Sequence, residues 1–315
     1  MREITIWGRR IADDEPCYVI AELGHNHGGS LDTARQMIAA SADAGVSACK
    51  LQKRDNATLY SPSMLRMPYE NPASFGATYG AHRQALEFSL SQIEACQVEA
   101  RKHDIAMFAT AFDEHSADLL MRMPVQPPAI KIHSGGLTDY PLLRHVASYG
   151  VPLILSTGGG DQADIDQAVQ TITAYHSQLA ILHCTASYPV TNYREMNLRC
   201  IQTFRDRYPD LVIGWSCHYS GIALSMMAYT LGARILEHHF TLNRASKGTD
   251  HGFSLEPVGM KKLCRDLARA HEAMGDGVKR FYPSEYGPIS KMRRWWIHGK
   301  WQIGTTAEQE TAVRA

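Results

Sequence analysis

Residues 18–44, YVIAELGHNHGGSLDTARQMIAASADA, contain one complete repeat of the pattern that decides the fold. A short apolar run at 18–21 is followed by polar residues and glycines. Next comes a stretch at 31–44 whose apolar residues recur at helical spacing. A strand followed by a helix is the unit from which parallel β/α proteins are built, so these residues predict a strand, a polar loop and a helix.

The same unit recurs along most of the chain. The predicted strands lie at 18–21, 48–51, 106–109, 129–132, 153–155, 179–182, 212–215 and 234–236. The clearest helical patterns between them lie at 31–44, 91–103, 161–175 and 221–231. Eight strand–helix units are the number that closes a TIM (β/α)8 barrel, so the sequence predicts an α/β protein with this fold. A doubly wound open sheet is the alternative, but it would concentrate polar residues at one switch point.

Polar residues stand at the end of every predicted strand. Because strand ends converge on one face of a barrel, where barrel active sites are built, these side chains are expected to form one site. The set comprises Glu22, His25, Asn26, His27, Lys50, Gln52, Thr110, Lys131, Ser134, Ser156, Thr157, His183, Thr185, Tyr188, Ser216, His218, Glu237 and His239.

A metal site is predicted at His218 and His239, which follow the seventh and eighth strands. One histidine in such a place is more often structural, but a pair on adjacent strands favours ligation. Two imidazoles with water and substrate oxygens suit Mn²⁺, with Mg²⁺ or Co²⁺ as alternatives. His238 should point to the opposite side of its strand and is the weaker candidate.

An anion site is predicted at Lys50 and Lys131, because a lysine inside an apolar barrel is costly unless an anion accompanies it. Serines after three strands add hydroxyl donors, and the glycines at 158–160 lead into a helix near Asp161, where backbone N–H groups can face phosphate. A small ligand with several negative charges fits this set. A Schiff-base role for Lys131 is the competing interpretation, but two lysines beside a histidine pair favour anion binding.

The composition sets the class of protein. The chain has 315 residues, of which 44% are hydrophobic, and Lys+Arg equals Asp+Glu at 32 each. Zero net charge gives no reason to expect nucleic acid or a membrane surface as partner. No apolar run approaches the roughly 20 residues that span a bilayer, and seven scattered cysteines contain no CxxC pair. We therefore expect a reduced, cytoplasmic protein.

Two regions interrupt the strand–helix rhythm. We expect a catalytic barrel at 1–280, with a long insertion at 54–86 that serves as a lid or partner contact, and a tail at 281–315. The tail mixes basic residues with tryptophans. Packing of these tryptophans on the barrel or on a partner subunit is favoured over nucleic-acid binding.

The chain resembles the sialic acid synthase (N-acetylneuraminate synthase, NeuB-type) family across the whole predicted barrel. The matching segments are AELGHNHGGSLDTARQMI, ADAGVSACKLQ, FATAF, IKIHSGGLTDYPLL, LILSTGGG, ILHCTASYP, IGWSCH and ILEHHFTLNRASKGTDHGFSLEP. The resemblance implies that phosphoenolpyruvate is added to the aldehyde of an N-acetylmannosamine-like sugar. The products would be phosphate and a nonulosonic (sialic-acid-type) acid or a related 3-deoxy-ulosonic acid.

The resemblance also implies roles for individual residues. His218 and His239 would hold the metal that polarises the aldehyde, and Glu22 would hold the attacking water. The positions that match the phosphoenolpyruvate site are Lys50, Thr110, Lys131, Ser134, Ser156 and Ser216. Gln52, Tyr188 and Asp250 match positions that contact the acceptor sugar, and Thr185 of the HCT motif is assigned to substrate binding.

Several departures from the family bear on the acceptor. Gly136 stands where the family has an acid, Ala186 where it has Asn or Ser, and Cys217 where it has Asp. We expect the C-terminal antifreeze-like domain, which places an arginine over the acceptor site, to be absent. Our hypothesis is that an arginine of the tail (Arg293 or Arg294) or the 54–86 insertion closes the site instead, and that the insertion or the tail forms a homodimer interface.

Three alternative functions remain at this point. A phosphoenolpyruvate-dependent synthase with a different acceptor is favoured by Gly136 and the absent domain. A lyase acting through a Lys131 imine would be revealed by borohydride trapping with pyruvate. An inactive scaffold barrel is disfavoured, because packing alone would not require the lysine and histidine pairs.

Overall fold

The computed structural model describes residues 2–312. The chain separates into two compact units, Met1–Glu272 and Ala273–Ala315. Within the described residues, no helix has both the length and the apolar character needed to cross a membrane.

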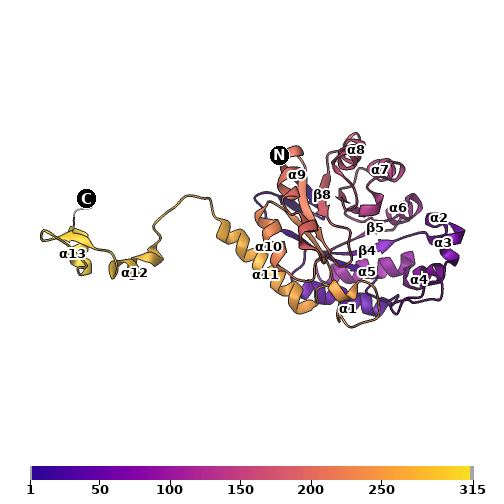
Figure 1. Ribbon diagram of the computed structural model, residues 1–315, viewed down its shortest axis with the longest axis horizontal. Helices are drawn as coiled ribbons and strands as arrows, with labels where there is room; N and C mark the ends of the chain where they lie inside the picture. Colours follow the sequence, from indigo (N-terminus) through magenta and orange to yellow (C-terminus); the bar gives the residue numbers. More distant parts are fainter. Residues whose placement is uncertain (1, 313–315) are drawn as a thin grey trace. The chain divides into compact units, whose positions relative to one another are not determined.

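Unit 1 is a closed barrel of eight parallel strands, as the sequence predicts (Figure 1). The strands are β3 (Tyr18–Gly24), β4 (Ala48–Lys53), β5 (Ala106–Ala111), β6 (Ile130–Ile132), β7 (Leu153–Ser156), β8 (Leu179–Cys184), β9 (Val212–Cys217) and β10 (Ile235–His239). β10 pairs with β3 to close the ring, with Ile235 opposite Tyr18. The TIM (β/α)8 prediction is confirmed.

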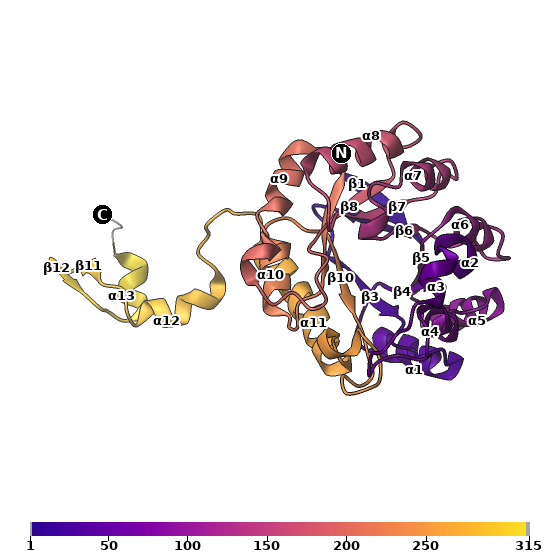
Figure 2. The same ribbon diagram turned by 45° about the vertical axis from the view of Figure 1, so that its right-hand side comes forward.

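Helices surround the barrel and pack on its outer face (Figure 2). They are α1 (Leu31–Asp43), α5 (Leu90–Lys102), α6 (Glu114–Met121), α7 (Tyr140–Ala147), α8 (Gln162–Thr173), α9 (Cys200–Arg207), α10 (Ala223–Thr230) and α11 (Pro257–Met274). The four most clearly predicted helices lie within two residues of their expected bounds. Local capping explains why α1 begins where it does, because the Ser30 side chain accepts a hydrogen bond from the Thr33 N–H.

An N-terminal hairpin closes one end of the barrel. Its strands are β1 (Glu3–Ile6) and β2 (Arg9–Ala12), and its isoleucines Ile4, Ile6 and Ile11 are buried in one cluster with residues near the starts of the barrel strands. The amino-terminal end is therefore filled by apolar side chains. Polar side chains gather at the opposite, carboxyl-terminal end.

The 54–86 insertion is folded. It contains α2 (Asn56–Leu59), α3 (Pro62–Arg66) and α4 (Tyr79–Leu86). The aromatic rings of Tyr60 and Tyr69 pack on Tyr79, and the Tyr69 ring also contacts His82. This aromatic packing holds α4 against the rest of the insertion.

Unit 2 contains two short helices and a hairpin after the end of α11. The elements are η4 (Pro283–Glu285), α12 (Tyr286–Ser290), β11 (Trp295–Ile297), β12 (Lys300–Gln302) and α13 (Thr306–Thr311). Trp296 and Trp301 face each other across the hairpin, with ring centroids 5.9 Å apart.

Gly214 in β9 is required by the close approach of neighbouring strands, which gives a test of the barrel. A Cβ at this position would lie 2.5 Å from the Ile235 carbonyl oxygen and 2.4 Å from Leu182 Cδ2. Gly214→Ala should therefore lower the free energy of unfolding by about 1–3 kcal/mol, measured by urea denaturation. Gly259→Ala in α11 is the control, since its Cβ makes only ordinary contacts and should be neutral or stabilising. Equal stabilities of the two variants would contradict this account of strand packing.

Candidate active site

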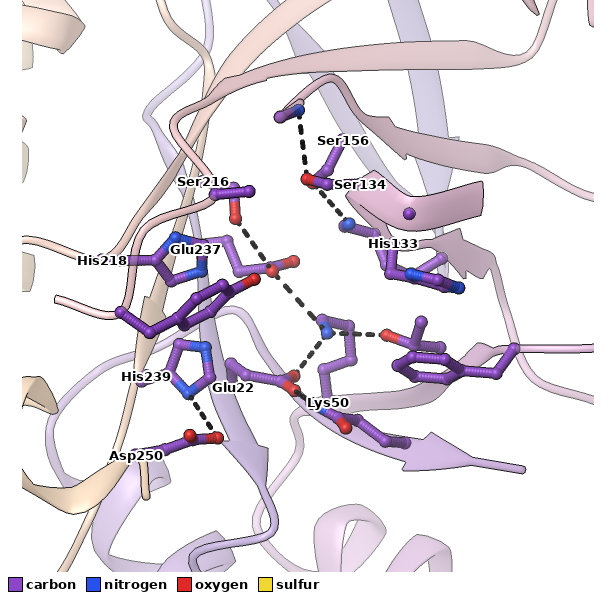
Figure 3. Close-up of a pocket in the computed structure, with 18 of the residues that line it drawn as sticks. Glu22, Lys50, His133, Ser134, Ser156, Ser216, His218, Glu237, His239 and Asp250 are labelled. Atoms are coloured by element: carbon purple, nitrogen blue, oxygen red, sulfur yellow. Dashed lines mark hydrogen bonds and ion pairs between the residues drawn. The ribbon is translucent and has the colours of Figure 1, made fainter. Parts of the chain in front are cut away.

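A cavity of about 550 Å³ lies at the carboxyl-terminal end of the barrel. All the residues predicted to have catalytic, metal-binding or substrate-binding roles line it except Thr185, whereas the strand-end residues Asn26, His27, Thr157 and His183 do not. The predicted residues that line it are Glu22, Lys50, Gln52, Thr110, Lys131, Ser134, Ser156, Tyr188, Ser216, His218, His239 and Asp250. Ten of the lining residues are labelled in Figure 3, where Lys50 lies between the His218–His239 pair and His133.

Thr185 is placed differently from the prediction. Its hydroxyl donates a hydrogen bond to the Glu195 carbonyl oxygen at 2.9 Å, and the residue does not line the cavity. Its own carbonyl oxygen lies 3.0 Å from His218 Nδ1. Thr185 therefore contributes to the site by orienting His218 through its backbone.

Lys50 is the centre of a buried ion-pair network. Its Nζ contacts a Glu22 carboxylate oxygen, lies 3.6 Å from Glu237 Oε1 and donates a hydrogen bond to Thr110 Oγ1 at 2.8 Å. The other Glu22 oxygen accepts a hydrogen bond from Gln52 Nε2 at 2.7 Å. Residues from β3, β4, β5 and β10 are thus held in one polar layer across the barrel mouth.

Lys131 is buried beside this network. Its Nζ donates to Ser156 Oγ at 2.6 Å and to the Ile132 carbonyl oxygen at 2.9 Å. Burial lowers the pKa of Lys131, while the Glu237 carboxylate opposes that shift. Burial alone would raise the pKa of Glu237, but Lys131 and Lys50 outweigh it and the pKa is lowered. Glu237 Oε2 is buried without a hydrogen-bond partner among the described residues.

The glycine turn after β7 leads into α8, but this helix offers fewer free backbone N–H groups than its sequence suggests. Gly158 and Gly159 line the cavity, and the Gly158 N–H donates to Ser134 Oγ at 3.1 Å. The first amides of α8 are occupied, however, because the Asp161 side chain accepts from the N–H groups of Ala163 and Asp164. Anion contacts here would come from the turn and the serine hydroxyls.

His218 and His239 face one another with ring centroids 5.3 Å apart. Burial and then the neighbouring His239 lower the pKa of His218 to about 4, so its imidazole is neutral near pH 7. With Nδ1 directed at the Thr185 carbonyl, the neutral ring presents Nε2 as an acceptor. His239 Nδ1 lies 3.6 Å from Asp250 Oδ2 and, among the described residues, has no hydrogen-bond partner.

This donor set fits a divalent ion that keeps most of its coordination positions open. Within residues 2–312 there is no group of three or more His, Cys, Asp or Glu side chains arranged to hold a metal. The neutral His218 imidazole and the unpartnered Nδ1 of His239 match an ion that draws its other ligands from water and substrate. Cys217 adds no ligand, since it does not line the cavity and its sulfur accepts from the Tyr219 N–H. His238 also points away and contacts Ser225 Oγ at 2.8 Å.

Two of the noted departures lie at this site. Gly136 ends the short helix η1 (Ser134–Gly136), and a Cβ there would lie 2.9 Å from Ile132 Cγ2. The local backbone therefore leaves little room for an acidic side chain. Ala186 lines the cavity next to Gly158 and offers no polar group in the place of an amide or hydroxyl.

Sequence reasoning assigned no role to several lining residues. Phe112 stacks on His133 with centroids 3.9 Å apart, and the Arg54 guanidinium lies 3.5 Å from the Phe112 ring centroid. Arg83 and His25 complete this wall, and both arginines come from the 54–86 insertion. His25 could be predicted because it follows a strand. Arg83 could not, because only the folding of the insertion brings it to the barrel mouth.

Comparison with known proteins agrees with this arrangement. The NeuB family model matches residues 37–279. Human N-acetylneuraminate-9-phosphate synthase is 35% identical over 285 residues, covering 90% of this chain and 79% of the human protein. N,N'-diacetyllegionaminic acid synthase of Campylobacter jejuni is 34% identical over 280 residues, covering 88% and 83%. The crystal structure of N-acetylneuraminic acid synthetase from Leptospira borgpetersenii superposes with a TM-score of 0.78 at 32% identity, covering 91% and 95%.

The closed barrel and the polar cavity at its carboxyl-terminal end define a TIM-barrel enzyme, and its relatives place it among the synthases. The chain belongs to the NeuB family.

Proposed function

We propose that this enzyme is a metal-dependent synthase that condenses phosphoenolpyruvate with a sugar aldehyde of the N-acetylmannosamine type. The products are phosphate and a nonulosonic acid or a related 3-deoxy-ulosonic acid. The observation that carries the proposal is that two groups of side chains line one cavity (Figure 3). One is the histidine pair, and the other is a lysine–serine layer that consists of Lys50, Lys131, Ser134, Ser156 and Ser216.

Phosphoenolpyruvate is the ligand that suits the lysine–serine layer. Lys50 and Lys131 supply two buried positive charges, and the hydroxyls of Ser134, Ser156 and Ser216 supply donors around them. A molecule with both a carboxylate and a phosphate uses charges and donors together. Thr110, which accepts from Lys50, belongs to the same subsite.

The acceptor aldehyde belongs at the histidine end. His218 and His239 would hold a divalent ion, Mn²⁺ by preference with Mg²⁺ or Co²⁺ as alternatives, which supplies Lewis-acid polarisation of the aldehyde. Tyr188 packs on His218 with centroids 4.0 Å apart, and Asp250 lies beside His239. These two side chains, with Gln52, would orient the sugar hydroxyls.

The reaction forms one bond between carbons and breaks one bond to phosphate. Carbon 3 of phosphoenolpyruvate attacks the aldehyde carbon, water adds to carbon 2, and phosphate leaves with cleavage of its C–O bond. Glu22, fixed by Lys50 and Gln52, would receive one proton of that water at its carboxylate and pass it to the oxygen of the former aldehyde, while the second proton of the water leaves with phosphate. Fixed donors and a water-poor cavity are what the chain must supply for these steps.

The relatives support sugar-acid synthesis without selecting one acceptor, since their names include a sialic acid phosphate and a legionaminic acid. The proposal further places the enzyme in the cytoplasm as a homodimer. The cytoplasmic placement is supported by its seven cysteines, all of which are free thiols in the structure.

The test is phosphate release from phosphoenolpyruvate by the Mn²⁺-supplemented protein. The panel comprises N-acetylmannosamine, mannose, arabinose and their phosphates, each with and without chelator. We expect release that requires one sugar and the metal. Absence of release with every sugar, together with no binding of phosphoenolpyruvate, would contradict the proposal.

A further inference from the structure

One wall of the cavity carries an arginine cluster, which we define as Arg54, Arg83 and His25. Arg54 is 4% exposed, and all three residues line the cavity. Within residues 2–312, neither guanidinium group has a carboxylate within ion-pair distance. The nearby Glu87 carboxylate is engaged elsewhere, because it pairs with Lys53 Nζ at 2.8 Å and accepts the backbone N–H of Arg54.

Hydrogen-bond donors exceed acceptors in this cluster. His25 Nε2 lies 2.7 Å from Arg54 Nη1, and His25 Nδ1 lies 3.4 Å from Arg83 Nη1. A neutral imidazole has one acceptor nitrogen, so it can accept from only one of the two guanidinium groups. Burial, then Arg54 and Arg83, lower the pKa of His25 well below its usual value, so the ring stays neutral. Arg54 Nε is buried and has no hydrogen-bond partner among the described residues.

The carboxylates of the cavity do not neutralise this wall. Glu22 and Glu237 face Lys50, and Asp250 lies beside His239. The two arginines are therefore surplus positive charges in a site whose other charged groups are already grouped together. A buried, uncompensated guanidinium group calls for an anion.

Neighbouring side chains hold the two arginines in place. The Arg54 guanidinium stacks on Phe112 and donates to Gln52 Oε1 at 2.5 Å. Arg83 Nε donates to Tyr79 Oη at 2.9 Å on the same face of α4. Held donors of this kind lose little freedom when an anion arrives. In Figure 3, His133, which stacks on Phe112, lies on the opposite side of Lys50 from His218 and His239.

We infer that the arginine cluster binds a phosphate group of the acceptor sugar, at the end of the sugar remote from its aldehyde. The inference rests on the proposed function, which places the aldehyde at the histidine pair. A phosphomonoester carries about −1.5 to −2 charges at pH 7 and three acceptor oxygens, which match two guanidinium groups. Arginine forks bind such groups with paired hydrogen bonds. The natural acceptor is therefore a phosphorylated aldose.

The test compares N-acetylmannosamine 6-phosphate with N-acetylmannosamine as acceptors for the full chain with Mn²⁺. Phosphoenolpyruvate consumption gives kcat and KM for both substrates. The variants are Arg54→Lys, Arg83→Gln and Arg66→Gln, the last an exposed arginine of the same insertion that does not line the cavity. We expect Arg83→Gln to raise the KM of the sugar phosphate about 10- to 100-fold, the effect of losing a charged hydrogen-bonding partner.

The expected pattern separates this inference from simple misfolding. Arg83→Gln should raise the KM of the sugar phosphate far more than the KM of phosphoenolpyruvate or of the unphosphorylated sugar, so the preference for the phosphorylated sugar collapses. Arg54→Lys keeps the charge but loses the fork, and should show a smaller rise in the same KM. Arg66→Gln should behave as the unaltered chain.

Three results would overturn the inference. Equal kcat/KM for the two sugars, unaffected by Arg83→Gln, would leave the proposed synthase intact and remove the phosphate subsite. An increase in the KM of phosphoenolpyruvate alone would assign the arginines to that substrate. Absence of turnover with every sugar would reject the proposed function and this inference together.

Discussion

Replacing either His218 or His239 with alanine is expected to reduce kcat/KM for the condensation by about a thousandfold. Polarisation of a carbonyl by a bound metal contributes several kcal/mol to transition-state stabilisation, and each 1.36 kcal/mol is a factor of ten in rate. Two imidazoles are the only protein ligands proposed here, so loss of one leaves the ion with a single anchor. Steady-state phosphate release measures the effect on catalysis.

Metal binding gives a second reading of the same variants. Titration with Mn²⁺, followed by electron paramagnetic resonance of the free ion, should show greatly weakened binding in both. The matched control is His238→Gln, since His238 is equally buried on β10 but contacts Ser225 outside the cavity. This control should keep most of its activity and bind Mn²⁺ normally. Full activity of His218→Ala in the presence of chelator would remove the metal from the proposal.

The barrel could be predicted because each strand–helix unit carries its own signal. Apolar runs such as 153–155 and helical periodicities such as 161–175 are local, and the parallel-sheet rule converts their alternation into a closed ring. Several strands were predicted to end too early, most clearly β3 and β10, which continue to Gly24 and His239. Polar residues at the barrel mouth remain in strand conformation because their hydrogen-bond partners lie on neighbouring strands. These partners are distant in sequence, so a local sequence pattern cannot reveal them.

The candidate site could be predicted where its residues lie in or just after strands, or, as for Asp250, where the family resemblance points to them. Lys50, Lys131 and His239 lie in strands β4, β6 and β10, and the barrel brings them together by topology. Arg83 gives no such signal, because it reaches the cavity only through the packing of α4 in the insertion. Thr185 shows the opposite failure, since its position after β8 is correct but its side chain turns to the Glu195 carbonyl.

Replacing Lys131 with methionine is expected to reduce kcat/KM for phosphoenolpyruvate roughly 30- to 5,000-fold, the range for removing one member of a buried charge pair. Methionine keeps much of the side-chain volume while removing the charge that faces Glu237 and the donor to Ser156. The loss should be dominated by an increase in the KM of phosphoenolpyruvate, because Lys131 is proposed to bind its anionic groups. Initial rates at varied phosphoenolpyruvate and saturating acceptor measure it.

Lys53→Met is the matched control, because Lys53 is a second buried lysine of a barrel strand, and its ion pair with Glu87 lies outside the active-site cavity. Both variants should lower the thermal midpoint of unfolding, and only Lys131→Met should change the KM of phosphoenolpyruvate.

Borohydride treatment of the unaltered chain with pyruvate distinguishes a lysine that binds an anion from a lysine that forms an imine. Reductive trapping of pyruvate on Lys131 would show imine chemistry and a lyase, whereas an unchanged protein mass with a raised KM in Lys131→Met fits a lysine that binds an anion. A KM for phosphoenolpyruvate that is the same in Lys131→Met and the unaltered chain would move the substrate away from this end of the barrel.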